Sequence, residues 1–125
     1  MRKAVLGALA LGIIMKLFLF DLMVAEGTSM APAIKPGTVL LISRLVYGFR
    51  VPWRDRYLLR WSVPREGDVV VFYTPAGDLA VKRCKEVGGG GEFTALGDNS
   101  LQSYDSRSYG SVSPDRIIGK VLGVK

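Results

Sequence analysis

The chain begins with its longest apolar segment. Residues 4–20 are apolar except for Lys16 and glycines, and further apolar residues follow at 22–25. A helix that crosses a bilayer needs about 20 mostly apolar residues, so this pattern predicts an N-terminal transmembrane anchor over residues 1–25. A cleaved signal peptide is the alternative for an apolar stretch behind a basic start. The length of the stretch favours the anchor.

The charges that flank this segment predict its orientation. Arg2 and Lys3 precede it, whereas Asp21 and Glu26 lie near its other end. The positive-inside rule keeps the basic end in the cytoplasm. We therefore expect a single-pass protein of the cell membrane with a cytoplasmic N-terminus. Residues 26–125 would form a domain on the outer, periplasmic or extracellular, face.

Residues 26–125 have the pattern of a small, mainly β domain. Short runs of apolar and β-branched residues occur at 38–46, 69–73, 79–85, 92–96 and 117–124. Turn-forming residues such as Lys35-Pro36-Gly37 separate them, which is typical of strands. The runs 69–73 and 79–85 flank a short turn and predict a β-hairpin.

The segment 49–65 mixes aromatic and basic residues. It contains both tryptophans, Trp53 and Trp61, among five arginines. Such amphipathic aromatics favour a lipid headgroup interface. Two alternatives remain open, a hairpin with tryptophans in the core and a surface that binds single-stranded nucleic acid. The nearby apolar segment favours lipid as the partner over nucleic acid.

Composition limits the organisation and the chemistry. With 125 residues, the chain has room for one small domain besides the anchor. Its net charge of +6 suits an anionic lipid surface or nucleic acid. Cys84 is the single cysteine, so we expect a small buried apolar residue there. The glycines at 88–91 lack the lysine and helix of a phosphate loop, and no cofactor or metal is predicted.

The stretch Gly27-Thr28-Ser29-Met30-Ala31-Pro32 contains the candidate nucleophile. The chain has no histidine, which excludes a Ser-His-Asp triad. A lysine kept neutral by burial can replace histidine as the base for a serine. The sequence therefore directs attention to the lysines.

Lys82 is the candidate base. In an extended strand, alternation puts Lys82 on one face with Ala80 and Cys84. These small, weakly polar neighbours would desolvate the ammonium and lower its pKa from about 10.4. A lysine on the solvent face of a strand is the alternative.

Four motifs in order resemble those of type I signal peptidases, membrane-anchored Ser-Lys proteases. Ser29-Met30-Ala31-Pro32 is similar to the nucleophile box Ser-Met-x-Pro, and residues 67–72 (GDVVVF) are similar to the Gly-Asp-hydrophobic strand. Lys82-Arg83 resembles the Lys-Arg box. Residues 97–110 (GDNSLQSYDSRSYG) resemble the box Gly-Asp-Asn-x-x-x-Ser-x-Asp-Ser-Arg-x-x-Gly.

The resemblance implies a role for each matching residue. Ser29 would be the nucleophile, Lys82 the general base, and Ser103 would hydrogen-bond and orient the lysine amine. The Ser29 N–H would stabilise the oxyanion. Substrate and oxyanion would also meet Gly27, Met30 and Ala80, and Gly27 stands where many members have a Ser or Thr hydroxyl. Ion pairs that support the site would involve Arg83, Asp98, Asp105 and Arg107.

The resemblance also implies a fold and a substrate. The fold would be small, strongly coiled β-sheets with a groove between the Ser29 segment and the Lys82 strand. Signal peptides of preproteins would bind there as an added strand. Alternatives are a pilus-subunit maturing peptidase of conjugation systems and an inactive, membrane-anchored β-domain that binds signal peptides. Self-cleaving repressors share the chemistry, but an apolar segment stands where their DNA-binding domain would be.

Overall fold

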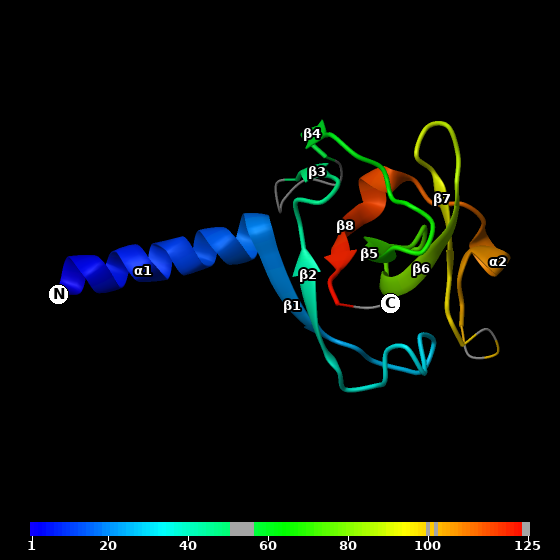
Figure 1. Ribbon diagram of the computed structural model, residues 1–125, viewed down its shortest axis with the longest axis horizontal. Helices are drawn as coiled ribbons and strands as arrows, with labels where there is room; N and C mark the ends of the chain where they lie inside the picture. The colour runs from blue at the N-terminus through cyan, green and yellow to red at the C-terminus, as the bar shows by residue number, and fades with distance from the viewer. Residues whose placement is uncertain (51–56, 100, 102, 124–125) are drawn as a thin grey trace.

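The computed structural model describes residues 1–50, 57–99, 101 and 103–123, apart from the side chains at 17 and 18. One helix leads into a domain of strands (Figure 1). The elements, in chain order, are α1 (Arg2–Ile14), the π-helical turn η1 (Met15–Leu19), β1 (Phe20–Val24), β2 (Val39–Ser43), β3 (Gly48–Phe49), β4 (Leu59–Arg60), β5 (Val69–Tyr73), β6 (Leu79–Val87), β7 (Phe93–Leu96), α2 (Ser106–Tyr109), the 3₁₀ turn η3 (Pro114–Arg116) and β8 (Ile117–Val121).

The strands form one antiparallel sheet and a small ribbon. The sheet has the order β1-β2-β8-β5-β6-β7, and β3 pairs with β4 apart from it. This architecture confirms the prediction of a mainly β domain. The predicted hairpin is also present, because β5 pairs with β6 in a register that sets Val70 opposite Lys82.

The core lies on both faces of β5. Val70 and Phe72 belong to a cluster with Cys84 and Phe93, while alternate residues of β5 pack in a second cluster that contains Met30. The strand is therefore buried on both sides, which explains its uninterrupted apolar run. Cys84 is fully buried, as expected for a small apolar residue.

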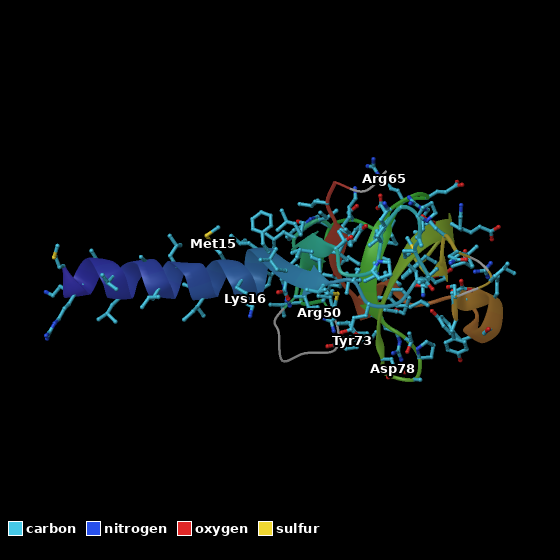
Figure 2. All side chains as sticks on the ribbon, turned by 90° about the horizontal axis from the view of Figure 1, so that it is seen from below. Met15, Lys16, Arg50, Arg65, Tyr73 and Asp78 are labelled. Carbon is cyan, nitrogen blue, oxygen red and sulfur yellow. The ribbon has the colours of Figure 1, made fainter. Side chains whose placement is uncertain are left out.

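The N-terminal segment differs from the prediction. Helix α1 spans 13 residues and projects from the domain (Figure 1), with its side chains pointing away on several sides (Figure 2). After η1 the chain becomes β1, which pairs with β2 from Phe20↔Ser43 to Val24↔Val39. The described residues contain no helix long and apolar enough to cross a membrane. A transmembrane helix over residues 1–25 is therefore not supported, because the last part of the apolar run is a strand.

The aromatic and basic segment 49–65 is described only in part. Trp53 lies outside the described residues. Trp61 is 58 % exposed, and its indole N–H donates to the Leu45 carbonyl at 3.1 Å. Trp61 is therefore a surface residue, contrary to the alternative that placed it in the core.

Candidate active site

Ser29 lies in the loop between β1 and β2. Backbone hydrogen bonds join the two ends of this loop to each other. Ala25 N–H donates to the Thr38 carbonyl at 2.8 Å, and Gly37 N–H donates to the Ala25 carbonyl at 2.8 Å. Gly27, two residues before the serine, has a φ of 73°, a left-handed conformation that favours glycine. The backbone thus turns sharply beside the nucleophile candidate.

The Ser29 segment is also fastened to the end of β7. Asn99 N–H donates to the Ser29 carbonyl at 2.8 Å. The next residue, Met30, is buried, and its sulfur accepts from Asp98 N–H at 3.4 Å. Across the described residues, the Ser29 N–H itself has no hydrogen-bond partner. This donor is consequently available for a ligand.

Lys82 stands on the buried face of β6, as the alternation predicts. It is only 7 % exposed, and Cys84 on the same face is fully buried. Burial lowers the pKa of Lys82, an effect that Asp105 opposes and Arg107 reinforces. Within the part of the chain that is described, its amine makes no hydrogen bond or ion pair. The alternative of a solvent-exposed lysine is therefore wrong.

Gly97, directly after β7, is the point where two candidate residues meet. Arg83 pairs with Leu96 at the end of β7. A Cβ on Gly97 would lie 2.1 Å from the Ser103 hydroxyl oxygen and 2.7 Å from the Ser29 carbonyl oxygen. Only glycine allows this close approach. Gly97 thus brings Ser29 and Ser103 together although they are far apart in the sequence, and Lys82 shares a groove with Ser29.

Asp105 organises the loop that carries Ser103. Its side chain is 0 % exposed and accepts from Gly97 N–H at 2.8 Å and from the Ser103 hydroxyl at 2.7 Å. The Arg107 guanidinium also binds it, with Nε at 2.9 Å. Burial acts to raise the pKa of Asp105, but these hydrogen bonds outweigh burial and hold it well below its usual range. The carboxylate is therefore firmly ionised.

The hydrogen bond of Ser103 differs from the prediction. We expected the hydroxyl to bind the Lys82 amine, but its proton goes to Asp105. The described hydrogen bonds include none between Ser103 and Lys82. The buried carboxylate is the stronger acceptor because it is charged.

The second predicted ion pair supports the site from the opposite face of β6. Arg83 binds Asp98 through two hydrogen bonds of 2.8 Å each and also donates to the Gly67 carbonyl at 3.0 Å. The pairing raises the pKa of Arg83 and lowers that of Asp98. The four charged residues thus pair as Arg83–Asp98 and Arg107–Asp105.

Ser29 and Lys82 line one groove of about 590 Å³. Its walls come from β1 and the following loop, from the β5–β6 hairpin, and from the loop before α2. Figure 2 marks the hairpin by Tyr73 and Asp78 at the edge of the domain. The sequence-predicted residues among the lining are Gly27, Ser29, Met30, Ala80 and Lys82.

Comparisons with known proteins show the family of the chain. The family described as "Signal peptidase, peptidase S26" matches residues 1–92. The chain belongs to this family. The matched residues include Ser29 and Lys82, which both line the groove.

Relatives named signal peptidase I resemble the chain at low identity. The protein of Pseudomonas fluorescens is 27 % identical over 98 % of this chain and 40 % of its own length. That of Pseudomonas aeruginosa is 25 % identical over 97 % and 41 %, respectively. That of Bacillus caldolyticus is 28 % identical over 86 % and 80 %. The chain thus spans about two fifths of the Pseudomonas proteins but most of the Bacillus one.

Sequence reasoning missed two parts of the groove. Met23 and Val24 of β1 and Ala25 directly after it line the groove, although their apolar run predicted a membrane helix. Tyr104 lines it from the loop before α2. The sequence signal that could have identified Tyr104 is its position between two predicted site residues, Ser103 and Asp105.

Proposed function

We propose that this member of the signal peptidase family is a serine endopeptidase that cleaves signal peptides from exported preproteins. The observation that carries the proposal is the shared groove, where Ser29 stands with a buried and unpaired Lys82. A buried amine without a partner loses its proton more easily than an exposed one. It therefore matches the base that a serine nucleophile requires.

The proposed reaction proceeds through an acyl-enzyme. Lys82 takes the hydroxyl proton while Ser29 Oγ bonds to the scissile carbonyl carbon. The tetrahedral intermediate collapses, the C–N bond breaks, and the Lys82 ammonium returns the proton to the leaving amine. Water then attacks the ester with Lys82 again as base, which releases the new carboxyl end and restores Ser29.

Asp105 contributes by directing the proton of Ser103. Because the Ser103 hydroxyl donates to Asp105, it can meet the Lys82 amine only as an acceptor, in a hydrogen bond that would form when substrate binds. The nitrogen lone pair of Lys82 is then left for the Ser29 proton. Ser103 thus acts as a positioning residue, and Asp105 acts through it.

The free N–H of Ser29 is the proposed donor to the oxyanion. Such a donor stabilises the charge that develops on the carbonyl oxygen and typically contributes about 3 to 4 kcal/mol. Gly27 has no side-chain donor to add, and Met30 fixes the segment through its buried side chain. The oxyanion site is therefore built mainly from backbone.

The substrate is proposed to bind as an added strand. Strand β1 pairs only with β2 among the described strands, and β6 pairs with β7 only from Arg83 onward. Residues 23–25 and 79–82 consequently face each other across the groove with unpaired edges. An extended peptide between them would pair with the backbone on either side, and its side chains would alternate beside small residues such as Ala80.

We also propose that the surface around β4 meets the lipid bilayer. Leu58, Leu59 and Trp61 are each more than half exposed, and Arg60 lies among them. Exposed apolar and aromatic side chains with a nearby cation suit an anionic headgroup interface. Arg50 anchors the base of this ribbon through its hydrogen bond to the Ile117 carbonyl, so the surface is held to the domain.

Replacing Leu58, Leu59 and Trp61 together by Ala should slow cleavage of a membrane-bound preprotein by roughly tenfold through lost lipid contact. Cleavage of a short soluble peptide should change by less than about twofold, because the groove is untouched. Rates on both substrates measure the effect, with Leu101→Ala as the exposed apolar control. Equal losses on the two substrates would contradict a lipid-facing role.

Cleavage of a preprotein tests the proposed function directly. The detergent-solubilised full chain, incubated with a preprotein, should release a product whose N-terminus lies just after the signal peptide. N-terminal sequencing of the product gives the site. Binding of the preprotein without any product would favour the inactive signal-peptide-binding alternative, and cleavage restricted to pilin precursors would favour the pilus-maturing one.

A further inference from the structure

A second hollow, the β1 hollow, lies where η1 joins strand β1. It has a volume of about 610 Å³ and is lined by Met15, Lys16, Phe20, Asp21, Leu22 and Leu41. Figure 2 marks this end of the N-terminal helical segment by Met15 and Lys16. The Asp21 carboxylate pairs with Arg44 at 3.3 Å, and the long Lys16 side chain can keep its ammonium in water. The β1 hollow thus offers a mainly apolar surface.

The β1 hollow and the groove follow one another along one strand. Met23 and Val24 of β1 line the groove, and the preceding residues of the same strand, Phe20 to Leu22, line the hollow. Leu22 and Met23 are adjacent in the chain, so the two depressions are neighbours on β1. The strand from Phe20 to Val24 spans about 13 Å at roughly 3.3 Å per residue. A peptide in the groove that extended a few residues further along β1 would therefore enter the hollow.

Exposed apolar side chains connect the two depressions. Phe20, Leu22 and Val24 alternate along β1 and so point to the same face, and each is at least 39 % exposed. Leu41 of β2 pairs with Leu22 and is 44 % exposed. Contiguous exposed apolar residues on a folded protein typically mark a binding surface. This row of β1 and its neighbour on β2 therefore form a surface that a ligand can cover.

A peptide bound as the proposed function describes would reach this row. It adds to the free edge of β1, and side chains on the same face of neighbouring strands lie about 5 Å apart. Peptide residues beyond the groove would thus lie beside Leu22 and Phe20. A signal peptide has an apolar segment of about 7 to 15 residues before its small-residue cleavage site, whereas the mature chain has no such requirement. The signal-peptide half of the substrate therefore matches the β1 hollow.

We propose that the β1 hollow binds the apolar segment of the signal peptide, with Leu22 and Leu41 as its contact residues. This inference rests on the proposed function, since it extends the same bound peptide beyond the groove. Burial of apolar side chains against Leu22, Leu41 and Phe20 stabilises the complex through the hydrophobic effect. Preproteins are then selected by two features, small residues at the cleavage site and an apolar segment upstream of them.

Two peptides that differ only upstream of the cleavage site test this inference. One has a segment of Leu and Ala there, and the other has Ser and Asn in the same positions. In detergent, kcat/KM of the full chain should be roughly tenfold higher for the apolar peptide. Replacing Leu22 and Leu41 together by Thr should reduce this ratio to within about twofold and leave the polar peptide's kcat/KM unchanged.

Val39→Thr is the matched control, because Val39 is exposed on the same two strands but lies outside the described lining of both depressions. This variant should keep the full ratio. If the double variant slows both peptides equally, or keeps the tenfold ratio, the inference is overturned.

Photocrosslinking identifies the occupant directly. The full chain with Ser29→Ala has a benzophenone amino acid in place of Leu22 and is mixed with a preprotein and phosphatidylglycerol vesicles. Light should attach this group to the apolar segment of the signal peptide, which mass spectrometry of the product locates. The same amino acid in place of Val39 should give little of this product.

The crosslinked product also separates this inference from the proposed function. Attachment to the mature part of the preprotein, or to phospholipid alone, would overturn the inference. Attachment to the apolar segment, by a protein whose wild-type form cleaves no preprotein, would retain the inference and overturn the proposed function.

Discussion

Ser29→Ala is expected to lower kcat/KM for preprotein cleavage by at least about 10⁴-fold, and Lys82→Ala by a similar factor. Each change removes one of two groups that act together. The Ser29 hydroxyl needs the Lys82 amine to accept its proton, and the amine has no role in the reaction without that hydroxyl. The double variant should be hardly worse than either single variant, since residues that act as a unit are not additive. Initial rates with a preprotein measure all three.

Controls separate lost chemistry from lost folding. Lys85→Ala changes an exposed lysine of the same strand and should leave kcat/KM within about twofold of wild type. Lys82→Ala removes a buried, unpaired amine, so its midpoint of thermal unfolding should be unchanged or higher. Full activity of either dyad variant would exclude Ser29 and Lys82 as the catalytic pair.

The same assay should show a rate that rises with pH. Burial lowers the pKa of Lys82 below its ordinary value of 10.5, and only the neutral amine can accept the Ser29 proton. As pH increases through the lowered pKa, the neutral fraction grows, and kcat/KM should increase and then level off. The midpoint should lie below 10.5. A rate that stays flat from acidic to alkaline pH would contradict a lysine base.

Asp105→Ala is expected to reduce the free energy of unfolding by about 2 to 4 kcal/mol. The change leaves the buried Gly97 N–H without its acceptor and removes the partner of Ser103. An unsatisfied buried donor costs about 1 to 3 kcal/mol, and lost charge-assisted hydrogen bonds add to it. Urea unfolding at neutral pH measures the loss. Asp98→Ala, which breaks the less buried pair, should cost about 1 kcal/mol or less.

Acid provides an independent check on Asp105. Its pKa lies below the usual range in the folded chain, so its ionised form stabilises the fold. That contribution is complete above the unfolded pKa of about 4 and is lost as pH falls from there toward the lowered folded value. Asp105→Ala should therefore lose less stability than wild type between pH 5 and pH 2. An identical acid dependence would show that Asp105 is not the linked group.

The sequence by itself determined which residues are candidates for the chemistry, and it predicted the central hairpin. The absence of histidine left lysine as the candidate base, and alternation along residues 79–85 put Lys82 on the same face as Cys84. Both inferences depend on local rules, residue type in one case and the two-residue period of a strand in the other. The pairing of β5 with β6 followed from a short turn between two apolar runs.

The tertiary structure decided what depends on distant partners. Phe20 to Val24 continues an apolar run that suits a helix, yet it pairs with β2, and its last two residues line the groove. Its conformation depends on pairing with residues 39–43, and a local pattern predicts that strand but not its partner. The proton of Ser103 likewise goes to Asp105 because that carboxylate is buried against Gly97. Ser29 reaches Gly97 only through the fold, since backbone contacts between residues about 70 apart depend on how the sheet curves, not on spacing along the chain.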